Sequence, residues 1–126
     1  MFLHSKLMQR ADRDDPVRVC LIGAGKFGSM FLSQVPSTPG LTVTHIADLN
    51  PDGARAACAN VGWDDALVQT THFTDDAFAA MAAEDVDVVV EATGNPHAGV
   101  RHARVAIAAG KHVVMVNVEA DVLAGA

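Results

Sequence analysis

The stretch VCLIGAGKFGSMF, residues 19–31, contains the pattern G-x-G-x-x-G. The pattern alone is a weak signal, because glycines also cluster in ordinary turns. Its neighbours strengthen it: the apolar run VRVCLI (17–22) precedes it, and KFGSMFLSQV (26–35) has apolar residues at helical spacing. The sequence therefore predicts a strand, a tight turn and a helix in succession, which is the arrangement that a dinucleotide-binding loop requires.

Each glycine of the pattern has a physical role. Gly23 allows the sharp turn, Gly25 lacks the Cβ that would keep a pyrophosphate from the backbone, and Gly28 lets the helix pack closely on the sheet. The helix N-terminus adds free N–H groups and a partial positive charge for the phosphates. Lys26 lies next to them in the sequence, where it either adds charge or is an exposed residue with no specific role.

Asp48 closes the predicted strand LTVTHIAD (41–48), 20 residues after Gly28. An acid at this distance can accept hydrogen bonds from the ribose of an adenosine. Its charge repels a 2′-phosphate, which modestly favours NAD over NADP, although Arg55 could swing back toward the site. Asp48 could also cap the helix that follows, a role compatible with ribose binding.

Strands and helices alternate along the rest of the chain. The later strands are almost wholly apolar, as expected of strands buried on both faces. We therefore predict the α/β class: a Rossmann-type, doubly wound parallel sheet of four or five strands, forming a single NAD(P)-binding domain over residues 16–126. The expected elements are a helix or flexible arm within 1–15, helices at 51–62, 75–84 and 95–111, strands at 86–93 and 112–118, and a short strand at TTHF (70–73), at the end of an otherwise unclear stretch at 63–70.

Composition excludes several classes of function. The net charge is −6 and no Lys/Arg cluster offsets it, so we expect no nucleic-acid partner. No apolar run approaches the roughly 20 residues that span a bilayer, and charges interrupt the first 15 residues, so we expect neither a membrane span nor a signal peptide. Cys20 and Cys58 are expected as small buried residues, a pattern typical of a cytoplasmic protein.

The carboxyl end of the strand at 86–93 adds candidate ligands. In open α/β sheets, ligands bind beyond the carboxyl ends of the strands. Thr93, Gly94 and Asn95 offer hydrogen bonds and a close backbone approach near the second half of a dinucleotide, and Asn95 also caps its helix. Glu91 either points into the cleft or is held by a backbone donor at the edge of the sheet.

The histidines do not indicate a metal site. His97 and His102 are five residues apart on a predicted helix, so they do not share a metal as an i, i+4 pair does. His45, His72 and His112 have no evident partner in the sequence. We expect no metal.

The segment VVVEATGNPHAGVRHARVAIAAGKHVVMVN (88–117) resembles the corresponding region of the homoserine dehydrogenase and Gfo/Idh/MocA groups of oxidoreductases. With the block at 17–51 before it and NVEADVLAG (117–125) after it, the likeness is strongest to homoserine-dehydrogenase-like proteins that carry a SAF domain and include the DXR-like enzymes. The resemblance implies NAD(P)-dependent oxidoreduction of a hydroxy, amino-acid-type or sugar-phosphate substrate, in some members with isomerisation.

The resemblance also implies roles for individual residues. It assigns the pyrophosphate to the glycine loop, the adenosine ribose to the acid after it, and the nicotinamide to the later strand ends. Carried over by position, the residues are Gly23, Gly25, Lys26, Phe27 and Gly28 for the pyrophosphate, Asp48 for the ribose, Thr93, Gly94 and Asn95 for the path to the nicotinamide, and Asn117 and Glu119 near its ring.

The chain departs from these groups in two respects. Their Glu-Lys-Pro or Asn-Lys after the fifth strand is replaced by NVEAD (117–121), so the substrate-site lysine is missing and no catalytic residue is assigned. A second domain holds the substrate in the resembling enzymes, whereas this sequence stops at Ala126. We therefore expect cofactor binding with negligible turnover by this chain alone, and apolar surface at the docking face that can drive assembly into a homo-oligomer.

Two other classes stay open at this point. A regulatory NAD(H)-sensing module has the same fold and needs no catalytic domain. A methyltransferase that binds S-adenosylmethionine also uses a glycine loop and an acid after the second strand, although its loop rarely has the full G-x-G-x-x-G.

Overall fold

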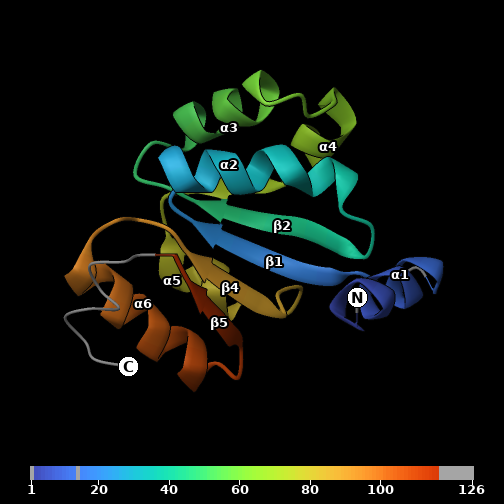
Figure 1. Cartoon of the computed structure of the whole chain (residues 1–126). Helices are drawn as coiled ribbons and strands as arrows, with labels where there is room; N and C mark the ends of the chain where they lie inside the picture. Colours follow the sequence, from blue (N-terminus) through green and yellow to red (C-terminus); the bar gives the residue numbers. More distant parts are fainter. Residues whose placement is uncertain (1, 14, 117–126) are drawn as a thin grey trace.

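The first strand lies at the centre of the sheet, and the later strands are added on both sides of it. In the computed structural model, which describes residues 2–13 and 15–116, five parallel strands lie in the order β3-β2-β1-β4-β5 (Figure 1). The Rossmann-type, doubly wound prediction is confirmed. The strands are β1 (Val17–Ile22), β2 (Leu41–Ala47), β3 (His72–Thr74), β4 (Val88–Glu91) and β5 (His112–Met115).

Helices cover both faces of the sheet. Figure 1 shows α2, α3 and α4 on one face, α5 and α6 on the other, and α1 beyond the end where the strands begin. Because helices lie on both faces of the sheet, both faces of the central strands are buried, which explains their apolar sequences. The helices are α1 (Phe2–Asp12), α2 (Lys26–Gln34), the 3₁₀ turn η1 (Val35–Ser37), α3 (Pro51–Asn60), α4 (Asp65–Thr70), α5 (Ala77–Ala82) and α6 (Pro96–Ala108).

Each face of the sheet has its own hydrophobic core. The α2/α3 face buries the indole of Trp63, whose Nε1 donates a hydrogen bond to the Leu32 carbonyl at 2.8 Å. Cys58 lies in this core and Cys20 in the α5/α6 core, both as free thiols. Burial raises the pKa of Cys20 to about 12 and that of Cys58 to about 11, so both thiols stay protonated. The expectation of small buried cysteines is confirmed.

Side-chain caps set where the helices begin. Asn95 accepts a hydrogen bond from the Ala98 N–H at 2.9 Å and caps α6, as predicted. Asp76 accepts from the Ala79 N–H at 3.0 Å, so α5 begins at Ala77 and is shorter than the predicted 75–84. The stretch at 63–70 that the sequence left unclear contains α4, which begins at Asp65 after the N-cap Asp64.

The ends of the last elements differ from the prediction. The short strand expected at TTHF (70–73) is observed as β3, two residues at its start being outside the strand, and α6 ends at Ala108 rather than at residue 111. Gly110 follows with a positive φ of 79°, which a glycine adopts without strain and which turns the chain into β5. The strand expected to reach residue 118 ends at Met115, and residues 117–118 lie outside the described residues.

Polar contacts hold the loop between α5 and β4. Asp87 accepts hydrogen bonds from the Arg18 backbone N–H at 2.9 Å and from its guanidinium at 3.1 and 3.2 Å. The hydrogen bonds from Arg18 keep the pKa of Asp87 below its usual range. The Lys111 ammonium donates to the carbonyls of Ala83 and Val86 at 2.8 and 2.6 Å. The loop is therefore tied to both β1 and the start of β5.

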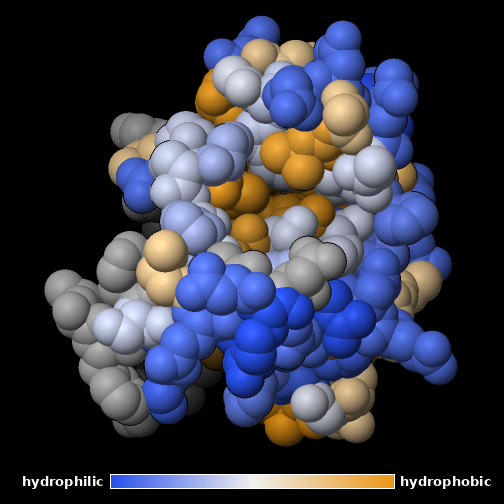
Figure 2. All heavy atoms as spheres, turned by 90° about the vertical axis from the view of Figure 1, so that its right-hand side faces the viewer, coloured by the Kyte–Doolittle hydropathy of each residue, from blue (hydrophilic) through white to orange (hydrophobic). Residues whose placement is uncertain are grey.

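Figure 2 shows the end of the molecule where the strands begin. Hydrophilic residues cover the lower part of this face, and hydrophobic side chains gather in a hollow above them. Of the helices that the structure describes, none combines the length and the apolar character needed to cross a membrane.

Trp63→Phe should lower the free energy of unfolding by about 1–3 kcal/mol, because it removes the hydrogen bond to Leu32 and leaves a small void. Urea denaturation followed by circular dichroism measures the change. Ile107→Ala, at a position 66% exposed, is the control and should stay within about 0.5 kcal/mol. A loss for Trp63→Phe no larger than the control's would contradict the role of the indole.

Candidate functional site

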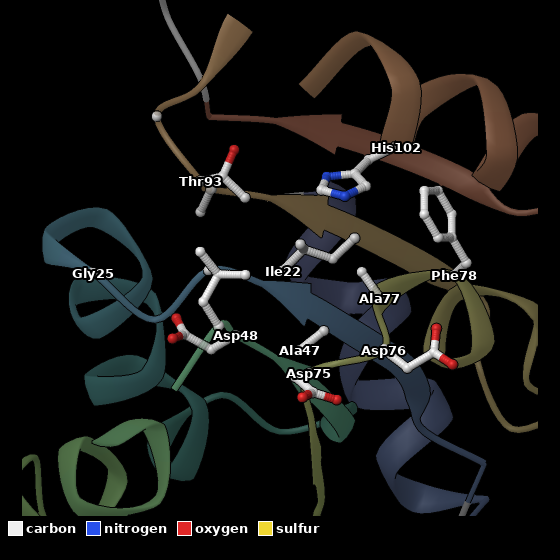
Figure 3. A pocket seen from close by; sticks show the side chains of 14 residues that line it. Ile22, Gly25, Ala47, Asp48, Asp75, Asp76, Ala77, Phe78, Thr93 and His102 are labelled. Atoms are coloured by element: carbon white, nitrogen blue, oxygen red, sulfur yellow. The ribbon is translucent and has the colours of Figure 1, made fainter. Parts of the chain in front are cut away.

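A cleft of about 850 Å³ opens at the carboxyl ends of β1, β2, β3 and β4. It lies where the strand order reverses between β1 and β4, the position at which open α/β sheets bind ligands. Figure 3 shows Thr93 and His102 on one wall and Asp48 and Asp75 on the other. The lining residues are Ile22, Gly23, Gly25, Ala47, Asp48, Leu49, Asp75, Asp76, Ala77, Phe78, Ala92, Thr93, Gly94 and His102.

Two glycines of the loop are required by packing. Gly23 has a φ of 91°, and a Cβ there would lie 2.9 Å from the backbone of Ala92. A Cβ on Gly28 would lie 2.2 Å from the Gly23 carbonyl oxygen. Helix α2 can therefore start this close to β1 only with glycine at both positions, in line with the sequence prediction.

The third glycine is open toward the cleft. A Cβ on Gly25 would meet nothing within 4 Å, and Gly25 lines the cleft. Gly25 is also the N-cap of α2, and it provides no side-chain hydrogen bond to the first turn. The backbone N–H groups of Lys26, Phe27 and Gly28 therefore have no capping side chain, and an anion can approach them. The side chains of Lys26 and Phe27 are outside what the structure describes.

Asp48 joins the ends of β1 and β2. One carboxylate oxygen accepts the Ala24 N–H of the glycine loop at 2.8 Å, and the other accepts the Asn50 N–H at 2.8 Å. Asn50, which accepts from the Gly53 N–H at 3.1 Å, is the cap of α3, so the alternative of Asp48 as this cap is wrong. A carboxylate oxygen has a further lone pair, which leaves Asp48 able to accept hydrogen bonds from a ligand in the cleft.

The loop after β3 adds acidic residues that the sequence analysis missed. Asp75 and Asp76 directly follow β3 and line the cleft, with Asp75 exposed. Their signal was in the sequence, since they come just after Thr74, which follows the predicted strand TTHF at its carboxyl end. The Arg55 guanidinium lies 4.6 Å over the ring of Phe73, a cation–π contact away from the residues that line the cleft. The wall near Asp48 is therefore negatively charged.

A buried acid holds the opposite wall. Glu91 is fully buried and accepts hydrogen bonds from the Thr93 N–H at 2.8 Å, the Thr93 hydroxyl at 2.5 Å and Nδ1 of His102. The His102 ring meets Phe78 edge to face at 5.8 Å. Of the two alternatives for Glu91, the backbone donor is the one observed. The pairing with His102, across 11 residues, was missed, because strand and helix patterns do not show which residues face one another.

Hydrogen bonding keeps Glu91 ionised. Burial alone would raise the pKa of Glu91, but the hydrogen bonds from His102 and Thr93 outweigh it and lower the pKa below the ordinary 4.5. An ionised carboxylate only accepts, so Nδ1 of His102 carries the proton in this contact. Nε2 is then the ring nitrogen left for the cleft that His102 lines.

The structure brings five of the eleven residues expected to bind a cofactor together at the cleft. Thr93 and Gly94 line the cleft with the glycine loop and Asp48. Asn95 caps α6 and is not among the lining residues. Asn117 and Glu119 lie outside the described residues.

The family comparison matches residues 17–115 to the oxidoreductase family with an NAD-binding Rossmann fold, Gfo/Idh/MocA. Among solved structures, the chain is similar to a homoserine dehydrogenase from Thiobacillus denitrificans, at 25% identity and a TM-score of 0.68, over 84% of this chain and 24% of that one. It is also similar to an NAD-binding protein from Listeria innocua, at 28% identity and a TM-score of 0.58, over 79% of this chain and 26% of that one.

A third similarity concerns the fold alone. The myo-inositol dehydrogenase from Lactobacillus casei, solved in complex with NAD(H) and myo-inositol, is 20% identical with a TM-score of 0.61, over 79% of this chain and 28% of that one. The chain thus spans about a quarter of the length of these solved proteins. A comparison with curated proteins gives no match.

Glu91→Gln should lower the free energy of unfolding by about 2–3 kcal/mol, because it removes the charged acceptor shared by Thr93 and His102. Since the folded pKa of Glu91 is lowered, the advantage of the wild type is full above its ordinary value of 4.5 and is lost as the pH falls through the folded value. Urea denaturation from about pH 3 to pH 6 measures this dependence. The exposed Glu84→Gln is the control, and an advantage of the wild type that does not change with pH would argue against the mechanism.

Proposed function

Because the chain belongs to the Gfo/Idh/MocA oxidoreductase family, with its NAD-binding Rossmann fold, we propose that the cleft binds the dinucleotide with its pyrophosphate at the glycine loop. The observation that carries this proposal is Gly25. It lies at the start of α2 without a capping side chain, and its missing Cβ leaves open space in the cleft. Backbone N–H groups at such a helix start are suited to a pyrophosphate.

The other lining residues then receive roles by position. Asp48 accepts hydrogen bonds from the adenosine ribose, while its contacts to Ala24 and Asn50 hold it in place. Thr93 and Gly94 line the path to the nicotinamide, and the hydrogen bond between His102 and Glu91 holds that wall. When bound, the nicotinamide ring supplies hydride transfer. Asn95 supports this path as the cap of α6, and Asn117 and Glu119 are proposed near the ring.

The acidic wall favours NAD over NADP. Asp48 and Asp75 bring negative charge to the side where the ribose is proposed, and a 2′-phosphate there would be repelled. From the sequence alone, Arg55 is a cation that could offset the charge of that phosphate. In the structure, Arg55 stacks on Phe73. NAD is therefore the cofactor that the charges support.

We assign the substrate by class only. The family is one of oxidoreductases, and we propose a hydroxy, amino-acid-type or sugar-phosphate substrate that is bound only together with a second domain. Residues 16–126 form the cofactor domain in this proposal, and residues 1–15 an N-terminal helical arm. An NAD(H)-sensing module is the alternative, whereas S-adenosylmethionine binding finds no support in the family match.

Gly25→Ala should weaken NADH binding by at least about tenfold while leaving the melting temperature unchanged, because the added methyl group enters only the open cleft. Gly28→Ala should lower the melting temperature as well, since its Cβ would clash with the Gly23 carbonyl. Fluorescence titration with NADH and thermal unfolding measure the two effects.

The control for this pair is Ser33→Ala, an exposed change near the other end of α2 that should alter neither quantity. If Gly25→Ala binds NADH as tightly as the wild type, the pyrophosphate does not lie at this loop.

Asp48→Ala should weaken NADH binding about tenfold or more and narrow the gap between NADH and NADPH affinities, since it removes both the ribose acceptor and a negative charge. Asp75→Asn should improve NADPH binding and leave NADH binding almost unchanged. Parallel titrations with the two cofactors measure the ratio. The exposed Asp65→Asn in α4 is the control, and a ratio unaffected by either cleft variant would rule out discrimination by charge.

A further inference from the structure

His45, His72 and Asp85 meet on the sheet face that α5 and α6 cover. His45 in β2 lies opposite His72 in β3, and their rings stack with centroids 4.8 Å apart and planes 23° apart. Nε2 of His45 lies 2.7 Å from a carboxylate oxygen of Asp85, in the loop before β4. The expectation that His45 and His72 have no partner is wrong, because the partners come from neighbouring strands and not from nearby sequence.

The backbone fixes the position of the three side chains. The register of β1 and β2 shifts between Val19 and Cys20, so that Val43 and His45 are paired with β1 and Thr44 is skipped. The Thr44 hydroxyl donates to the Asp85 carbonyl at 2.9 Å. Arg18 and Lys111 hold the same loop from its other side through Asp87, Ala83 and Val86. The backbone of Asp85 is therefore held beside β2 by contacts that do not involve its carboxylate.

The two histidines differ in exposure, which leaves one side of the cluster accessible. The side chain of His45 is 14% exposed and that of Asp85 is 46% exposed, while His72 is exposed at the start of the edge strand β3. The hydrogen bond between His45 and Asp85 is complete without His72. The ring of His72 places a third donor beside that pair.

We propose that His45, His72 and Asp85 form a binding site for a divalent transition-metal ion of the zinc type. One nitrogen of each histidine and one oxygen of Asp85 all lie within 4.8 Å of one another. Two imidazoles and one carboxylate suit zinc, with water in the remaining position. Bonds of about 2.0–2.2 Å require the three atoms to be roughly 3.4 Å apart, so the exposed His72 ring turns inward on binding.

The site is separate from the cofactor cleft. Asp48 comes three residues after His45, just past the end of β2, and Asp75 comes three residues after His72, just past the end of β3, so both strands run from the metal site toward the cleft. The two histidines and Asp85 are not among the residues that line the cleft. Metal binding can therefore be tested without the dinucleotide, and its failure would leave the proposed function untouched.

The test is zinc binding by the full chain after removal of any histidine tag. Isothermal titration with ZnCl₂ should give one ion per chain, and the melting temperature should rise with zinc concentration, since the ion joins β2, β3 and the loop before β4. Co²⁺ in place of zinc should give the intense visible absorption of a four-coordinate site. Mg²⁺, which prefers oxygen ligands, should neither bind nor stabilise the chain.

Two variants and a matched control decide the assignment. His72→Ala and Asp85→Asn should each weaken zinc binding at least tenfold and reduce the Co²⁺ absorption. Because His72 is exposed, His72→Ala should fold normally, and its circular dichroism spectrum checks this. His112→Ala is the control, because His112 is also an exposed first residue of an edge strand, β5. Zinc affinity that is unchanged in both site variants, reduced equally by His112→Ala, or absent at millimolar zinc in the wild type would overturn the proposal.

Discussion

The contact between Gly28 and the Gly23 carbonyl is the constraint on which the rest of the site depends. With no side chain on either residue, α2 begins directly against the end of β1, and its N-cap Gly25 lines the cleft. Asp48 reinforces this arrangement by accepting the Ala24 N–H at 2.8 Å, which ties the loop to the end of β2. The glycine loop, the acid and the helix start therefore form one unit, held by backbone contacts.

Sequence patterns within single strands, turns and helices predicted the fold and the glycine-loop side of the cleft. The glycine spacing, Asp48 and the apolar strands indicated the doubly wound sheet, because each depends on residues within one turn or strand. The prediction was weaker where partners are far apart in sequence. Glu91 with His102, and His45 with Asp85, are joined by the register of neighbouring elements, which no periodicity records. The helix α4 was missed because its apolar residues are adjacent in the sequence and none are three or four positions apart.

The walls of the cleft differ in how their charge is managed. On the side of β4, the Glu91 carboxylate is buried and its oxygens are occupied by hydrogen bonds from Thr93 and His102, so its charge is kept away from the cleft. On the side of β2 and β3, Asp48 and Asp75 remain in contact with the cleft and give it a negative potential. A dinucleotide, whose two halves differ in chemistry, suits a cleft with two such unlike walls.

The two cysteines lie one in each hydrophobic core, Cys58 with Trp63 and Cys20 with Met81. Their thiols are buried and keep their protons, so thiol reagents reach them only when the surrounding layer opens. Alkylation at each cysteine would thus report the local opening of one side of the sheet. The chain carries a pair of built-in probes that can tell whether a ligand stiffens one layer or the whole molecule.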